Sequence, residues 1–268
     1  KFIRKNKDNP FFCYVPFTIP HAAMQSPEER IAPWRKKFPE FENVTGKYGG
    51  SVIKNPVAAF AAMMTHMDED VGRILDLLSE LGVSDDTLVM FTSDNGPHKE
   101  GGHKPDFFDS NGPLKGYKRD LYEGGIRVAT LARWSGKIKP GSKSSHVAAG
   151  WDLLPTVCEL AGIKSPKGLD GVSFAPTLLG QSKMQKKRDY LYWEFHERGG
   201  KQAVRMGKWK GIRLNVRKNP NSPIELYDLS KDIGEENNLA GEYPQIVKKI
   251  EVAMRDSHIE SDVFTFLK

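Results

Sequence analysis

The sequence predicts an α/β protein in which a mostly parallel sheet is flanked by helices and is followed by a small antiparallel α+β subdomain. A long helical pattern runs promptly into an apolar strand pattern, and this alternation is typical of parallel sheets. Beyond residue 187, strand patterns follow one another before a final helix, which is typical of an antiparallel α+β unit. The 268 residues suffice for one large domain with a smaller appendage, which we place at residues 1–187 and 188–268.

The longest predicted element is a helix over residues 55–82. Asn55 is placed to cap it, Pro56 occupies its first turn and Gly82 ends it. Apolar residues recur at steps of three and four along one face, which is therefore expected to face the core. His66 lies beside this face and is not expected to be functional.

Other apolar runs predict the remaining elements of the first region. Buried strands are expected at residues 9–17, 87–93 and 127–134, and short helices at 151–162 and 173–180. Residues 22–54 are rich in proline, glycine and charge, which predicts a long surface excursion. Cys13 and Cys158 fit neither a disulfide framework nor a zinc site, and both are expected to be buried within apolar runs.

The C-terminal region predicts a small sheet and one helix. A strand is expected at residues 189–195, a hairpin at 202–214 that turns at Gly207-Lys208, and another strand at 225–229. An amphipathic pattern over residues 243–257 predicts the closing helix.

Composition limits the partners of the chain. No apolar run approaches the ~18 residues that a membrane span needs, so no membrane partner is expected. The net charge of +6 and the pI near 9.1 favour anionic partners, but no nucleic-acid-binding module is recognisable. The basic stretch from Lys208 to Lys218 is interpreted as solvated surface, or as part of a funnel for a small anion.

Asp94 and Asn95 follow directly on the predicted strand of residues 87–93. In open α/β sheets, ligands gather at the carboxyl ends of strands, and His21 lies at another such end. Carboxylate and amide oxygens suit a hard cation such as Ca²⁺ or Mg²⁺. The same residues are also favoured in ordinary turns, so the spacing alone leaves a turn and a metal site as alternatives.

A second candidate feature precedes the strand at residues 127–134. Lys115, Lys118 and Arg119 lie shortly before a tight bend at Gly124-Gly125. Basic side chains beside such a bend could hold an anion, and they could equally be ordinary solvent-exposed charges.

Six stretches of the sequence occur together in the order found in one protein family. They are "PFFCYVPFTIPH", "HMDEDVGRILDLLSELG", "TLVMFTSDNGP", "GYKRDLYEGGIRVATLARWSGKI", "WDLLPTVCELAG" and "ELYDLSKDIGEENNL". With these motifs, which cover nearly the entire chain, the sequence resembles the sulfatase family in its arylsulfatase-like branch. The resemblance implies an alkaline-phosphatase-like fold that is incomplete at its N-terminus.

The resemblance also implies a chemistry. Enzymes of this family hydrolyse sulfate esters with a formylglycine, made from Cys or Ser in a C/S-x-P-x-R motif, and with a bound Ca²⁺. Asp94 and Asn95 match the metal ligands, His21 matches a histidine that contacts the sulfate group, and Lys118 matches a lysine that contacts sulfate and the leaving-group oxygen. His98 and His103, in the loop that follows, are candidate substrate-binding residues that no family motif fixes.

The sequence departs from the family in lacking the C/S-x-P-x-R motif. Since the chain also opens on Lys1 rather than on a methionine, we expect it to be the C-terminal portion of a longer sulfatase, inactive by itself. Its expected partners are the missing N-terminal half and a carbohydrate or aryl sulfate. Periplasmic or extracellular residence follows from the resemblance.

Two alternative functions stay open. One keeps the superfamily and replaces the sulfate ester by a phosphate or phosphonate ester. The other is a non-catalytic protein that binds anionic glycans, although such a protein has no need of His21, Asp94, Asn95 and Lys118 together.

Overall fold

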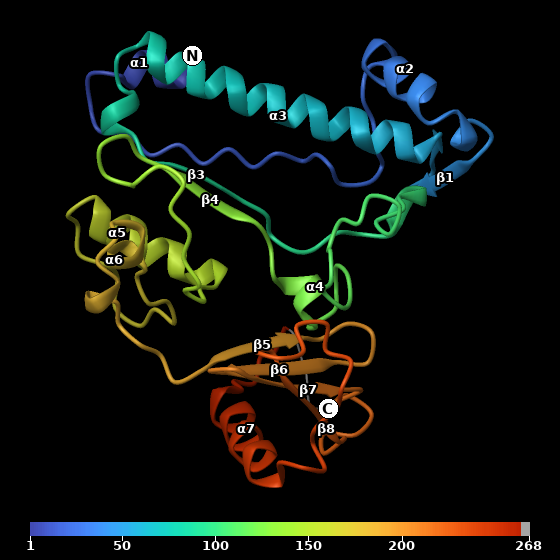
Figure 1. Ribbon diagram of the computed structural model, residues 1–268, viewed down its shortest axis with the longest axis vertical. Coiled ribbons are helices and arrows are strands. Elements are labelled where there is room, and N and C mark those ends of the chain that lie inside the picture. The colour runs from blue at the N-terminus through green and yellow to red at the C-terminus, as the bar shows by residue number, and fades with distance from the viewer. Residues whose placement is uncertain (264–268) are drawn as a thin grey trace. The chain divides into compact units, whose positions relative to one another are not determined.

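The structure is a computed structural model that describes residues 1–263 (Figure 1). The described chain divides into two compact units, and each is interrupted in sequence by the other. The first unit comprises Lys1–Phe91, His98–Ser110 and Leu131–Ile138, and the second comprises Thr92–Pro97, Asn111–Thr130 and the chain from Lys139 onward. The predicted domain boundary at residue 187 stays a prediction.

The first unit is dominated by one long helix. Within residues 1–86 its elements are α1 (Phe2–Asn6), α2 (Glu28–Lys37), η1 (Pro39–Phe41), β1 (Thr45–Tyr48), β2 (Ser51–Lys54), α3 (Pro56–Glu80) and η2 (Ser84–Asp86). A further short turn of helix, η3 (Glu100–Gly102), follows later in the chain. Strands β1 and β2 pair antiparallel.

Helix α3 confirms the predicted long helix. The Asn55 side chain accepts a hydrogen bond from the backbone N–H of Ala58 at 3.0 Å, so the predicted cap forms. Val57, Met67 and Leu78 of the predicted apolar face are buried, whereas Met64 of that face is exposed and Met63 is buried instead. Among residues 1–263 no helix, α3 included, is long and apolar enough to cross a membrane.

The predicted buried strand at residues 9–17 is wrong. No strand is assigned there, and Phe12 and Tyr14 are 69% and 77% exposed. Cys13 is exposed with them, whereas Cys158 is buried as expected. A strand is stable only when neighbouring strands take up its backbone hydrogen bonds, and within residues 1–263 this segment has no such neighbour.

The predicted surface excursion at residues 22–54 is also wrong in part, because it contains α2 and the β1–β2 hairpin. Helix α2 buries Ile31 against Met24, Ile53, Ala59 and other residues of one core cluster. Proline inside a segment normally argues against a helix, but Pro33 lies in the interior of α2 all the same. Packing against α3 therefore outweighs local propensity here.

Strands β3 (Val89–Thr92) and β4 (Thr130–Arg133) pair in a two-stranded sheet, at the positions of two predicted strands. They are less buried than expected, and Leu131 of β4 is 65% exposed. The combination of helices and sheets confirms the α/β class. Strands β1 and β2 pair antiparallel, and so do the neighbouring strands within residues 191–228. The mostly parallel sheet therefore stays a prediction.

The second unit contains a four-stranded antiparallel sheet. Its elements are α4 (Glu123–Ile126), η4 (Gly150–Asp152), α5 (Leu153–Leu160), α6 (Ala175–Leu178), η5 (Ser182–Met184), β5 (Leu191–Phe195), β6 (Lys201–Met206), β7 (Trp209–Leu214), β8 (Ile224–Asp228) and α7 (Pro244–Ser257). The strands lie in the order β5-β6-β7-β8 (Figure 1). The predicted hairpin, flanking strands and closing helix are confirmed.

Both faces of this sheet are covered. Helix α7 packs on one face, in a core that includes Val204, Leu226, Ile250 and Met254. The segment around α4 packs on the other face, where Leu121 meets a core that includes Ala203, Ile212 and Tyr227. Figure 1 shows α4 and α7 on opposite sides of the sheet. Because alternate side chains of a strand point to opposite faces, adjacent residues such as Ala203 and Val204 serve different cores.

Candidate functional site

The strand end after β3 forms a polar turn. Asp94 is exposed and Asn95 is half-buried. The hydroxyl of Ser93 donates to the carbonyl oxygen of Asn95 at 3.0 Å, and the Asn95 amide nitrogen donates to the carbonyl oxygen of Gly96 at 3.0 Å. These bonds fit the turn interpretation, and they leave the Asp94 carboxylate and the Asn95 amide oxygen as the atoms that could bind a cation.

The strand end is joined to the segment that carries Lys118. The backbone N–H of Lys118 donates to the carbonyl oxygen of Pro97 at 2.8 Å. The backbone N–H of Gly96 donates to the carbonyl oxygen of Gly125 at 2.9 Å. The second unit thus brings the predicted metal ligands and the predicted lysine onto two segments linked by backbone hydrogen bonds.

The residues present fit only part of a calcium site. Asp94 and Asn95 supply oxygen donors of the right kind, but Ca²⁺ takes about 6–8 oxygens. Within residues 1–263 there is no group of three or more His, Cys, Asp and Glu side chains placed to hold a metal ion. Asp94 and Asn95 therefore account for only some of the ligands that such a site needs.

The three candidate histidines gather in the first unit. The rings of His21 and His98 have their centroids 6.0 Å apart, and those of His98 and His103 lie 5.0 Å apart. Nδ1 of His98 accepts a hydrogen bond from the backbone N–H of Glu100 at 3.1 Å, and its Nε2 lies 3.0 Å from the carbonyl oxygen of Pro20. A ring nitrogen that accepts is unprotonated, so Nε2 carries the proton and donates to Pro20, the residue before His21.

His103 is the most deeply buried of the three, with 4% of its surface exposed. Its ring stacks on Phe60 with centroids 3.7 Å apart, and neither ring nitrogen has a hydrogen-bond partner among residues 1–263. Burial, and secondly the neighbouring His98, lower the pKa of His103 to about 3. His103 is therefore neutral near pH 7, and as the structure stands it acts as an aromatic packing residue.

A buried ionic cluster that was not expected from the sequence lies beside the Lys118 segment. Lys210 is fully buried, with its ammonium 2.8 Å from Oε1 of Glu123 and 3.5 Å from Oε1 of Glu235. Burial by itself would raise the pKa of Glu123, but the charges of Lys210 and Arg205 outweigh it and lower that pKa. Burial raises the pKa of Glu235. The interpretation of the stretch from Lys208 to Lys218 as solvated surface is wrong at Lys210, and the apolar alternation around it was the signal.

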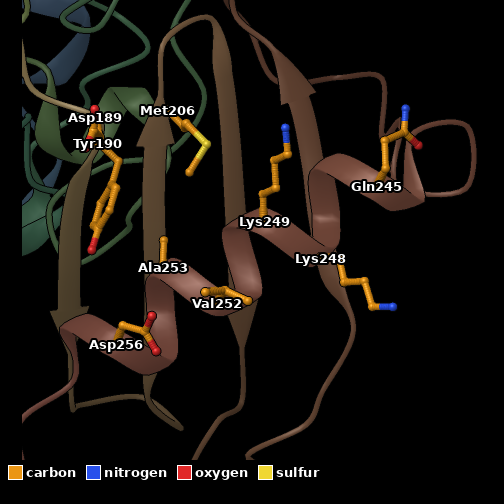
Figure 2. A pocket seen from close by; sticks show the side chains of 9 residues that line it. All are labelled: Asp189, Tyr190, Met206, Gln245, Lys248, Lys249, Val252, Ala253 and Asp256. Atoms are coloured by element: carbon orange, nitrogen blue, oxygen red, sulfur yellow. The ribbon is translucent and has the colours of Figure 1, made fainter.

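The second unit also has a pocket that is unrelated to these residues. It has a volume of about 530 Å³ and lies against α7, where it is lined by side chains that include Gln245, Lys248, Lys249, Val252, Asp189 and Met206 (Figure 2). None of the candidate site residues contributes to it. The candidate site is therefore identified by the types of its side chains and not by the position of this pocket.

Comparisons with protein families give two matches that together extend over residues 1–260. Residues 1–163 match the family described as Sulfatase. Residues 115–260 match the family described as N-sulphoglucosamine sulphohydrolase, C-terminal. The two matches overlap across the segment that carries Lys118.

Individual relatives are nearly twice as long as this chain. Human arylsulfatase A is 34% identical over 218 residues, which cover 71% of the chain and 41% of the relative. Among solved structures, Ps i-CgsB in complex with k-i-k-neocarrahexaose aligns with a TM-score of 0.77 at 28% identity, covering 95% of this chain and 52% of that one. The phosphonate monoester hydrolase of Agrobacterium radiobacter aligns with a TM-score of 0.63 at 22% identity, covering 96% and 59%, which shows a shared fold. The chain spans about half the length of such relatives.

Proposed function

Because the chain belongs to the sulfatase family, we propose that it forms the C-terminal part of a calcium-dependent hydrolase of sulfate esters. Its proposed metal ligands are Asp94 and Asn95, and its proposed substrate-contacting residues are His21 and Lys118. The nucleophile, a formylglycine, is proposed to lie outside this chain, and we expect this chain by itself to be inactive.

One observation carries the proposal. The hydrogen bond from the Lys118 backbone N–H to the Pro97 carbonyl oxygen, 2.8 Å long, joins the turn of Lys118 to the strand end of Asp94 and Asn95. An ordinary surface turn does not need a hydrogen bond to a second segment. A site for a sulfate ester does need such a link, because cationic groups must be held at fixed positions around the sulfate group.

The proposed roles follow from the charges of the side chains. Calcium, when bound, would supply positive charge against the sulfate oxygens. The ammonium of Lys118 stabilises the negative charge that develops on the leaving-group oxygen as the S–O bond breaks. Nδ1 of His21 is engaged with the carbonyl oxygen of Ala22, so we assign its Nε2 to the sulfate group. His98 supports that assignment by holding Pro20.

The substrate class is proposed from the relatives. The structure of Ps i-CgsB was solved with the oligosaccharide k-i-k-neocarrahexaose. We therefore propose a sulfated glycan as substrate, with an aryl sulfate as a convenient analogue. Periplasmic or extracellular residence is proposed with it, as is usual for the family.

The test uses the full-length protein that contains this chain. With an aryl sulfate and calcium, Asp94→Ala and Lys118→Met are expected to lower kcat/KM at least about 100-fold, since each removes charge that acts on the transition state. Asp85→Ala and Lys139→Met remove one exposed charge of the same sign elsewhere and serve as matched controls. Full activity in Asp94→Ala, or in the presence of a calcium chelator, would contradict the proposal.

A second candidate function is hydrolysis of phosphate or phosphonate esters. It has the support of the shared fold with the phosphonate monoester hydrolase. Turnover of an aryl phosphonate at least as fast as that of the aryl sulfate would favour it. Binding of sulfated glycans without turnover of either ester would favour a non-catalytic protein.

A further inference from the structure

Lys118 lies in a tight turn whose backbone conformation is unusual. The N–H of Asp120 donates to the carbonyl oxygen of Tyr117 at 2.8 Å, which closes a four-residue turn with Lys118 in its second position. The third residue, Arg119, has a φ of +77°. Turns of this kind prefer glycine in that position, because a side chain there is sterically disfavoured. Something outside the turn must therefore stabilise it.

Lys201, at the start of strand β6, makes the contacts that would do so. Its ammonium donates to the carbonyl oxygen of Arg119 at 2.7 Å and to Oδ1 of Asp120 at 2.7 Å. The other oxygen of Asp120 accepts from the N–H of Tyr117 at 3.1 Å. The Lys201 side chain is only 11% exposed, so little water competes for these bonds. Hydrogen bonds from an ammonium are stronger than those between neutral groups.

The sheet holds Lys201 itself in place. Strand β6 lies between β5 and β7, where Lys201 is paired with Phe195 on one side and with Leu214 on the other. Along β6 the side chain of Arg205 points to the same face and pairs with Glu123 at 3.1 Å, just beyond the turn. The turn thus rests on a paired, central strand.

We propose that Lys201 is a positioning residue that holds the turn of residues 117–120 in the conformation that presents Lys118. The kinetic part of this inference rests on the proposed role of Lys118 in turnover. The structural part concerns only the turn, and it is tested separately.

The kinetic test uses the full-length protein and an aryl sulfate. Lys201→Met is expected to lower kcat about 10- to 100-fold, with a smaller change in KM, because a small displacement of Lys118 impairs the chemical step most. Lys208→Met is the matched control: it removes another Lys–Asp ion pair of the same sheet, with Asp228 at 2.6 Å, and should leave kcat within about twofold. Lys201→Arg keeps the charge and should lose less activity than Lys201→Met. If Lys201→Met does not fold, Lys201→Arg is measured in its place.

A double-mutant cycle shows whether Lys201 acts through Lys118. In a Lys118→Met background, Lys201→Met is expected to cost no more than about twofold further, because the group it positions is already gone. Losses that multiply would overturn the inference, since they indicate a general structural effect. So would an unchanged kcat in Lys201→Met.

Amide hydrogen exchange of the full-length protein tests the turn without reference to catalysis. In Lys201→Met the amides of Lys118 and Asp120 should exchange at least about tenfold faster, while those of β6 and β7 keep their protection. Unchanged exchange at both turn amides would overturn the inference. If Lys118→Met has no effect on turnover but exchange quickens as expected, the proposed function fails at Lys118 while the role of Lys201 in the turn stands.

Discussion

Gly96 and Gly124 approach so closely that a β-carbon at Gly96 would lie 1.8 Å from the carbonyl oxygen of Gly124. The N–H of Gly96 donates in the same place to the carbonyl oxygen of Gly125. The absence of a side chain at Gly96 therefore permits the contact between the end of β3 and the segment of Lys118. The motif "SDNGP" needs glycine for this contact, whereas Gly124 of "YEGG" is needed within its own segment, since a β-carbon there would lie 2.3 Å from the carbonyl oxygen of Gly116.

We predict that Gly96→Ala destabilises the protein by about 1–3 kcal/mol, because a backbone carbonyl cannot move aside as a flexible side chain can. Denaturant unfolding would measure the change. Gly72→Ala is the control, since a β-carbon at Gly72 of α3 meets nothing within 4 Å. That substitution should stabilise the protein by about 0.5–1 kcal/mol, as glycine is unfavourable inside a helix. An equally stable Gly96→Ala variant would show that the two segments are not in contact.

Lys210→Met is predicted to lower the free energy of unfolding by about 3–5 kcal/mol, because it removes the fully buried cation that contacts both Glu123 and Glu235, whereas Arg205 contacts only Glu123. Lys208→Met should cost about 1 kcal/mol or less, since Lys208 is 48% exposed and water already screens its ion pair. Chemical denaturation of both variants would make the comparison. Equal losses would mean that Lys210 is not buried with Glu123.

The pH dependence of stability should report on His103. Its pKa of about 3 in the folded state lies below the ordinary value of 6.5, so the unfolded chain takes up the proton first as the pH falls. Burial of neutral His103 therefore costs little free energy of unfolding above pH 6.5, and this cost grows as the pH falls from 6.5 towards 3. Between pH 7 and pH 5 this single group should cost about 2 kcal/mol of unfolding free energy.

His103→Leu is the variant that isolates this contribution, because it places an apolar side chain of similar volume against Phe60. It should be at least as stable as the wild type at pH 7, since the replaced ring nitrogens have no partner among the described residues. Its loss of stability between pH 7 and pH 5 should be smaller by about 2 kcal/mol. Met64→Leu, at an exposed position of α3 without a titratable group, should keep the wild-type dependence. Parallel curves for His103→Leu and the wild type would contradict the assignment.

Thiol reactivity should distinguish the two cysteines of the isolated chain. Cys13 is exposed, so it should react with Ellman's reagent without denaturant, whereas Cys158, 5% exposed, should react only after unfolding. Cys13→Ser should abolish the fast reaction. In a full-length protein, where we expect a further portion to pair with residues 9–17, the Cys13 reaction should slow at least about tenfold. An equally fast reaction there would mean that this segment stays uncovered.

The sequence by itself determined the elements whose signals are local. The periodicity and the Asn55 cap predicted α3, and alternation with a turn at Gly207-Lys208 predicted the β6–β7 hairpin. The order of its motifs was enough to identify the family. Each of these features depends on residues that are close together along the chain.

Only the tertiary structure decided which side chains are covered and by what. It placed Lys210 inside the second unit and Cys13 on the surface, against the expectation in both cases. It also brought Lys201 to Asp120, in the turn of residues 117–120, across 81 positions of the sequence. An alternating pattern says which residues share a face of a strand, but the burial of a charge depends on partners that distant segments bring to that face.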